Sequence, residues 1–270
     1  MTNTPRRVCV TTILLSLITL SAYSDAVSDK GREIFEAHKS AVVTVQVVMK
    51  MKFSFPGMGS QEDESKSEVT GTVISEDGLT LVSLSETDPT SLIKNMMAGQ
   101  AGMENMQMET EIRDVKILTA DGTEIPAEII LRDKDLDMAF VRPTEKPSTP
   151  MDYISLENPG EPDYLDQIVT INQLGKVARR THSVSLERIQ AIVTKPRTFY
   201  LPGNDPSQTG LGSPAFTLDG NLIGVFLLRS IKSTGGSAMS MLGGMQDNVM
   251  AIIVPAADIQ DAASQAPPLK

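Results

Sequence analysis

Three Asp-Gly pairs, each placed between two short apolar runs, constrain the fold of this 270-residue chain more than any other feature. The pairs are Asp77-Gly78, Asp121-Gly122 and Asp219-Gly220. This dipeptide is typical of tight β-hairpin turns, because glycine adopts a positive φ angle without steric cost. Short strands separated by turn signals along most of the chain favour an all-β barrel architecture over a parallel sheet covered by helices.

The segments between these turns predict the other elements. A short amphipathic helix is expected over 28–40, with Ser28 as its N-cap and Ile34, Phe35 and His38 on one face. Phe53 to Glu68 is predicted to be a solvated loop, because it combines a Pro-Gly break with three consecutive acids. Strands are expected at 41–51, 115–118, 125–131, 166–174, 183–194, 218–229 and 248–255, a linker at 143–150 and a closing helix at 256–263.

The first 24 residues have the pattern of a secretory signal peptide. Arg6-Arg7 precedes an apolar stretch over 8–22, and Ala22-Tyr23-Ser24 fits a small-x-small cleavage site. An uncleaved anchor is the alternative. No later stretch is apolar enough to cross a bilayer, so we expect a periplasmic or secreted protein without stable membrane insertion after cleavage.

Composition excludes several classes of function. Without residues 1–24 the chain has 22 basic and 34 acidic side chains, a net charge of −12, which disfavours nucleic acids and anionic membrane surfaces as partners. Cys9 is the sole cysteine and lies in the leader, so no disulfide or thiolate is expected in the exported chain. With only His38 and His182 present, we expect neither a histidine-rich metal site nor a cofactor.

One stretch resembles a known catalytic loop. Residues 210–225 read Gly-Leu-Gly-Ser-Pro-Ala-Phe-Thr-Leu-Asp-Gly-Asn-Leu-Ile-Gly-Val. They resemble the nucleophile loop of trypsin-like serine proteases of the HtrA (high-temperature-requirement) type, where G-N-S-G-G-P-L precedes a hairpin ending in D-G-x-(V/I)-I-G. Counting back from Gly224 without a gap places Leu211 at the position of the family's nucleophile.

Other segments carry the same resemblance in the same order. Residues 71–82 are similar to the family's G-x-V-I-S-x-D-G-x-I-L-T hairpin, and counting on from it places Ser85 where the family has its general-base histidine. Residues 133–141 are similar to T-D-L-A-(V/L)-L, which places Asp137 at the triad carboxylate. Residues 88–112 are longer than in most relatives, so they are interpreted as an insertion with helical segments.

The resemblance implies two six-stranded antiparallel barrels with short N- and C-terminal helices. We expect a signal peptide at 1–24 and one trypsin-like peptidase-type domain at 25–270, with the N-terminal barrel at about 41–142, the linker at 143–150 and the C-terminal barrel at 151–260. A PDZ domain is not expected. Oligomers are common among relatives, but the sequence identifies no contacts for one.

The predicted triad is degenerate, because Leu211 cannot attack a carbonyl and Ser85 cannot replace a histidine base. Asp137 is interpreted as a buried hydrogen-bond partner of nearby backbone, of Ser85 or of Thr87. An alternative is an active endopeptidase that uses Ser213 as nucleophile, either with His182 brought in from the second barrel or as a serine-lysine dyad. His182 is instead expected to be a partly buried, hydrogen-bonded residue of a strand.

Methionine is unusually frequent, with 15 residues against 11 Phe plus Tyr and no Trp. Met-rich surfaces adapt to many peptide shapes, so three segments are candidate peptide-binding loops; disordered insertions that tuck some methionines onto the barrel are the alternative. A Cu(I) site in the second segment is a further alternative. The candidates are Met58; Met96, Met97, Met103, Met106 and Met108; and Met239, Met241 and Met245.

These observations predict an exported pseudoprotease that binds polypeptide or acts as a scaffold or regulator of active relatives. That part of the prediction comes from the family resemblance alone. The competing hypotheses are the endopeptidase that uses Ser213 and the methionine-rich Cu(I)-binding periplasmic protein.

Overall fold

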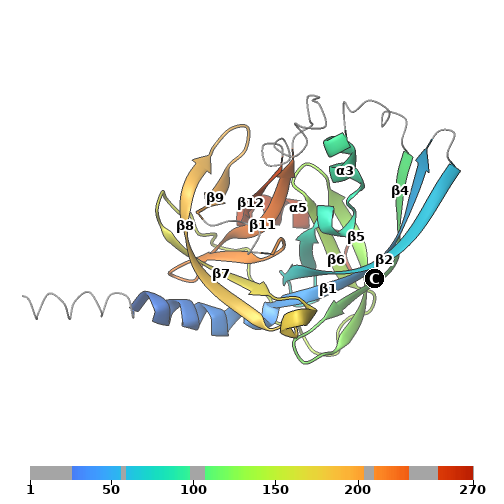
Figure 1. Cartoon of the computed structure of the whole chain (residues 1–270). Coiled ribbons are helices and arrows are strands. Elements are labelled where there is room, and N and C mark those ends of the chain that lie inside the picture. Colours follow the sequence, from blue (N-terminus) through green and yellow to red (C-terminus); the bar gives the residue numbers. More distant parts are fainter. Residues whose placement is uncertain (1–25, 56–58, 98–106, 204–209, 231–248, 270) are drawn as a thin grey trace, which may run out of the picture.

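Two closed six-stranded antiparallel barrels form the molecule (Figure 1). The computed structural model describes residues 26–55, 59–97, 107–203, 210–230 and 249–269. Around the first barrel the strand order is β1-β2-β3-β6-β5-β4, and around the second it is β10-β11-β12-β9-β8-β7. The all-β, double-barrel architecture expected from the sequence is confirmed.

The elements follow the chain in two blocks. The first barrel contains β1 (Val42–Phe55), β2 (Gly59–Val73), β3 (Thr80–Ser83), β4 (Gln107–Leu118), β5 (Glu124–Asp133) and β6 (Met138–Pro143). The second contains β7 (Gln167–Gln173), β8 (His182–Val193), β9 (Phe199–Pro202), β10 (Pro214–Thr217), β11 (Leu222–Ser230) and β12 (Val249–Pro255). The helical segments are residues 26–38, η1 (Lys39–Ala41), α2 (Leu84–Thr87), α3 (Thr90–Met97), η2 (Lys176–Ala178) and α5 (Ala256–Ala263).

The three Asp-Gly pairs form the predicted turns. The glycine of each pair has a φ angle between 84° and 86°, a conformation that residues with a Cβ rarely adopt. The turns join β2 to β3, β4 to β5 and β10 to β11. Local turn chemistry therefore fixes the register of three hairpins.

The prediction of a loop from Phe53 to Glu68 is wrong, because the described residues of this range, 53–55 and 59–68, are strand. β1 and β2 pair without interruption from Val42–Thr72 to Phe55–Gly59. The acids lie on an exposed strand opposite lysines, with Lys50 across from Glu64 and Lys52 across from Glu62. Opposite charges on paired strands stabilise the sheet, so the acidic composition that indicates solvent is also compatible with a solvated strand.

The N-terminal helix is close to its prediction. Ile34 is 6% exposed, Phe35 packs against the core, and the His38 ring stacks on Phe216 with centroids 4.7 Å apart. The face predicted for these residues is confirmed. Ser28 lies inside the helix, because residues 26 and 27 are already helical, so its assignment as N-cap is wrong.

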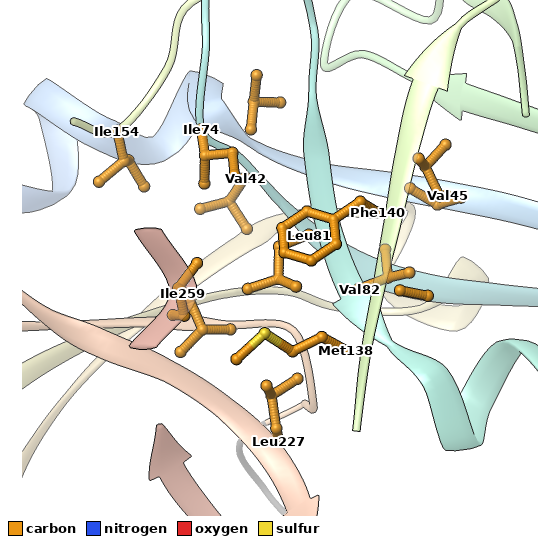
Figure 2. Close-up of a cluster of buried hydrophobic side chains, with 14 of the residues drawn as sticks. Val42, Val45, Ile74, Leu81, Val82, Met138, Phe140, Ile154, Leu227 and Ile259 are labelled. Carbon is orange, nitrogen blue, oxygen red and sulfur yellow. The ribbon is translucent and has the colours of Figure 1, made fainter. Parts of the chain in front are cut away.

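The core continues from one barrel into the other. Figure 2 shows Leu81, Met138 and Phe140 of the first barrel close to Leu227 of β11 and Ile259 of α5. All five side chains are fully buried. The α5 helix begins directly after β12. Its apolar face is buried in the same core cluster as side chains of the first barrel, so it stabilises the contact between the barrels.

Candidate functional site

Asp137 is the centre of the site, in the turn between β5 and β6. Its φ angle is 59°, a left-handed conformation that aspartate tolerates better than most residues. One carboxyl oxygen, Oδ1, accepts hydrogen bonds from the backbone N–H of Ser85 (2.8 Å) and from its hydroxyl (2.6 Å). The other, Oδ2, accepts from the Ser83 hydroxyl (2.6 Å) and the Leu228 N–H (2.9 Å). Both oxygens of this buried carboxyl group are therefore fully engaged.

The short helix α2 places Ser85 beside Asp137. The Leu84 N–H donates to the backbone carbonyl of Asp137 at 2.8 Å, so the pairing of β3 with β6 continues into the first turn of α2. Ser83 stands at the N-cap position but makes no side-chain cap, because its hydroxyl donates to the carboxylate. Backbone and side chain of Asp137 together hold the segment that carries Ser83 and Ser85.

Glu86 brings a second carboxyl group to the site. Its pKa is raised to about 8, first by burial and then by the negative charge of Asp137. Its Oε2 is buried and has no hydrogen-bond partner among the described residues. Burial also raises the pKa of Asp137, against the lowering effect of its hydrogen bonds to Ser83, Ser85 and Leu228. Glu86 is therefore largely protonated at neutral pH, while four donors favour the carboxylate form of Asp137 against the burial that raises its pKa.

The loop over 210–213 makes no described hydrogen bond to Asp137 or Glu86. Leu211 is partly exposed at the turn, and Ser213 is completely buried. The Ser213 hydroxyl donates to the amide oxygen of Asn172 at 3.1 Å, which also accepts from the Thr70 hydroxyl at 3.0 Å. An amide oxygen does not take a proton from serine, so this contact does not activate Ser213.

Gly212 fixes the loop against the first barrel. Its φ angle is 84°, and a Cβ atom at this position would lie 2.0 Å from the carbonyl oxygen of Thr70. Its N–H donates to Phe226 at 2.7 Å, and its carbonyl accepts from the Thr72 hydroxyl at 2.7 Å. Only glycine fits such a close approach of backbone to backbone.

His182 has a structural contact. It is the first residue of β8, pairs with Gln173 of β7, and is partly buried. One ring nitrogen, Nε2, lies 2.7 Å from the carbonyl oxygen of Val42. This matches the expectation of a partly buried, hydrogen-bonded strand residue. The contact joins the ring of His182 to the backbone of the first barrel.

The structure thus brings Ser85 and Asp137 into direct contact. Neither Leu211 nor Ser213 has a described hydrogen bond to this pair. The Thr87 hydroxyl, a suggested partner of Asp137, lies instead near the carbonyls of Ser83 and Leu84. Sequence reasoning missed Ser83, Glu86 and Asn172. The Ser-x-Ser-Glu pattern of residues 83–86 is a signal for the first two, since it places three polar side chains at the end of a buried strand and directly after it.

The methionine segments fall largely outside the described residues. This holds for Met58, Met103, Met106, Met239, Met241 and Met245. Met96 and Met97 end α3. Met108 is a residue of β4 and is 2% exposed, so its assignment to a peptide-binding loop is wrong. No group of three or more His, Cys, Asp or Glu side chains in the described part of the chain could hold a metal ion.

Comparison with known families gives a match over the region that contains this site. A family model described as "Trypsin-like peptidase domain" matches residues 69–225, more than half of the chain. The match includes Ser85, Asp137 and the loop over 210–213. No curated protein matches the sequence. Among the described residues, no helix has both the length and the apolar character needed to span a membrane.

Proposed function

We propose that this chain, which belongs to the trypsin-like peptidase domain family, is an exported member that has lost catalysis and binds polypeptide as a scaffold or regulatory protein. The observation that carries the proposal is the contact of Ser85 with Asp137. A serine hydroxyl occupies the hydrogen-bonding position beside the carboxylate from which a histidine would act as base. A hydroxyl group does not accept a proton near neutral pH.

The position of the nucleophile supports the same conclusion. The resemblance of residues 210–225 to the family's nucleophile loop, counted back from Gly224 without a gap, implies Leu211 at that position. An aliphatic side chain has no atom that can attack a carbonyl. Loss of nucleophile or base from such a triad costs roughly a millionfold in turnover, and loss of both costs little more because they act as a unit. The expected residual hydrolysis is at background level.

The endopeptidase alternative has little support from the contacts of Ser213. Its hydroxyl donates to Asn172, and the nitrogen of His182 that is hydrogen-bonded faces Val42. A serine-lysine dyad would need a lysine amine near the hydroxyl, and no described contact of Ser213 is with lysine. The Cu(I) alternative is weakened because Met108, one of its proposed ligands, is buried in β4.

Polypeptide binding is supported by the strand edge beside Asp137. β10 pairs with β11 only as far as Val225. Beyond it Gly212 and Ser213 bond the backbone of Phe226 and Asp137 accepts from the Leu228 N–H, so no described strand pairs with β11 past Phe226 on this side. An extended polypeptide can align with the end of β11 by strand addition, near the carboxyl pair. The methionine-rich segments stay in the proposal as candidate peptide-binding segments, because methionine side chains adapt to many peptide shapes.

The test uses an active-site-directed fluorophosphonate probe and fluorescent casein as substrate. The mature protein should show neither labelling nor hydrolysis, and should bind labelled, unfolded casein reversibly. The matched positive control is the double variant Ser85→His/Leu211→Ser, which puts the expected base and nucleophile at the two altered triad positions and should gain labelling at position 211.

Labelling of the unaltered protein at Ser213 or Ser85 would overturn the loss of catalysis. Casein hydrolysis that disappears in Ser213→Ala would establish the endopeptidase alternative. Absence of casein binding, together with absence of labelling, would leave the degenerate site in place and reject polypeptide capture.

A further inference from the structure

Three strands of the first barrel extend beyond it and form a separate surface, which we call the arm. The arm comprises residues 48–55 of β1, 59–68 of β2 and 107–114 of β4, and it lies at the upper right of Figure 1. Within the arm β1 is central, since it pairs with β2 on one side and with β4 on the other. β2 and β4 are therefore its two outer strands.

The outer edge of β2 has no partner strand in the described part of the chain. β2 pairs with β3 only at Thr72 and Val73, whereas its pairing with β1 starts at Gly59. Over residues 60–67, the backbone groups that point away from β1 thus have no described strand to pair with. Such an edge is a ready template for another extended chain.

The side chains of this edge are acidic on both faces. Glu62, Asp63 and Glu64 are consecutive and exposed, so neighbouring carboxylates point to opposite faces of the sheet. Glu62 forms an ion pair with Lys50 at 2.5 Å, while Asp63 and Glu64 have no ion pair among the described residues. Lys66 is the one basic residue within 60–67.

This charge pattern decides which chain can pair with the edge. Two copies of β2 aligned antiparallel around Asp63 would place acidic side chains opposite each other, and like charges directly opposite destabilise a strand pair. A chain with basic side chains at alternate positions would instead place them beside Glu62 and Glu64. Charge complementarity therefore selects a basic partner and disfavours self-association.

The other edge of the arm is a poorer candidate. On β4, Glu109 and Glu111 lie on one face, and Glu111 already pairs with Arg113 at 2.9 Å. The Thr90 hydroxyl of α3 lies 2.7 Å from that of Thr110, which places α3 against this strand. The β4 edge serves as the internal control.

We propose that residues 60–67 of β2 bind a basic, extended polypeptide segment by strand addition. Backbone hydrogen bonds to the unpaired edge supply affinity, and Glu62 and Glu64, which share one face, select lysine or arginine at alternate positions. The site is remote in sequence and in contacts from the carboxyl pair at Asp137, so it is independent of the polypeptide binding proposed above.

The experiment measures binding of a fluorescent peptide, in which lysine alternates with valine, by anisotropy at low salt. The double variant Glu62→Lys/Glu64→Lys should weaken binding about tenfold or more, because two attractive cross-strand pairs on the face that meets the lysines become repulsive. The matched variant Glu109→Lys/Glu111→Lys changes the net charge equally and should weaken binding about twofold or less. The same peptide with an N-methyl group on every residue keeps its charge, loses its backbone donors on both edges and should not bind.

Hydrogen exchange of the unaltered protein, measured with and without the peptide, is a second test that does not depend on the folding of a double variant. Added peptide should slow amide exchange within residues 60–67 and leave residues 107–114 unchanged. Equal losses in the two double variants, equal binding of the N-methylated peptide, or an absence of binding and protection would each overturn the proposal.

Discussion

Asp137 and Glu86 show how two carboxyl groups share one buried position. Two hydroxyls and two backbone N–H groups favour the carboxylate form of Asp137 and oppose the burial that raises its pKa. Glu86 lacks such donors at Oε2, and it holds a proton instead. A carboxylate kept for hydrogen bonding in this way needs no catalytic function to explain its burial.

Replacement of Glu86 by glutamine should remove a pH dependence of stability. The folded pKa of about 8 lies above the ordinary value of 4.5, so the stability linked to this group is complete below pH 4.5 and is lost as pH rises through 8. The unaltered protein should lose on the order of 3 kcal/mol between these limits. Glu86→Gln should flatten that loss in urea unfolding measured from pH 5 to pH 9.

The control for this prediction is Glu145→Gln, an exposed carboxyl group in the segment between the barrels. It should leave the slope of stability against pH unchanged. An identical slope in the unaltered protein and in Glu86→Gln would show that Glu86 ionises in the folded state as it does in the unfolded chain.

At the scale of elements, α5 is the piece that joins the two barrels. It begins directly after β12 and buries Ala256, Ile259 and Ala262. Figure 2 shows Ile259 beside Leu227 and near Met138, at the point where the second barrel meets the first. The helix has only eight residues, too few to be stable alone, so its stability comes from this buried face.

Truncation of Ile259 should therefore destabilise the whole molecule. Ile259→Ala should reduce the free energy of unfolding by about 3 kcal/mol, from lost burial and the cavity that remains. Gln260→Ala, at the exposed neighbouring position, should cost less than about 0.5 kcal/mol. Chemical denaturation monitored by circular dichroism measures both, and equal effects would place α5 outside the shared core.

The elements that the sequence predicted well are those with local causes. The Asp-Gly hairpins and the closing helix over 256–263 depend on turn residues and on spacing within a few positions. Residues 59–68 were mispredicted because β2 is stabilised by pairing with β1, and a run of serines and acids carries no sign of that pairing. Ser85 and Asp137 could be placed from motif spacing, whereas burial of Glu86 and the contact of Ser213 with Asn172 depend on tertiary packing.

At the scale of the whole molecule, Glu68 connects the barrels by charge. Arg180, next to η2 in the second barrel, donates to Glu68 of β2 through two nitrogens at 3.0 and 2.8 Å. Lys176 and Gln46 also contact this carboxylate. These contacts lower the pKa of Glu68 to about 2, mainly through the hydrogen bond from Arg180.

Removal of Arg180 should weaken the molecule and change its acid response. The folded pKa lies below the ordinary value of 4.5, so the stabilisation is complete above pH 4.5 and is lost as pH falls through 2. Arg180→Ala should cost on the order of 1–2 kcal/mol at pH 7 and reduce the loss of stability between pH 5 and pH 2. Thermal unfolding across this pH range measures both effects.

Arg179→Ala is the matched control, since it removes the same charge from an exposed neighbour. It should reproduce neither effect. Acid curves of Arg180→Ala that coincide with those of the unaltered protein would indicate that Glu68 is stabilised by its other partners.

The seat of Gly212 against Thr70 has a mechanical consequence. The loop that carries Leu211 touches the neighbouring barrel backbone to backbone, with no room for a single added carbon. A displacement of one barrel relative to the other must therefore also displace this loop. A ligand wedged between the barrels would reshape the loop without touching it, and a ligand on the loop would, in turn, set how the two halves of the molecule are aligned.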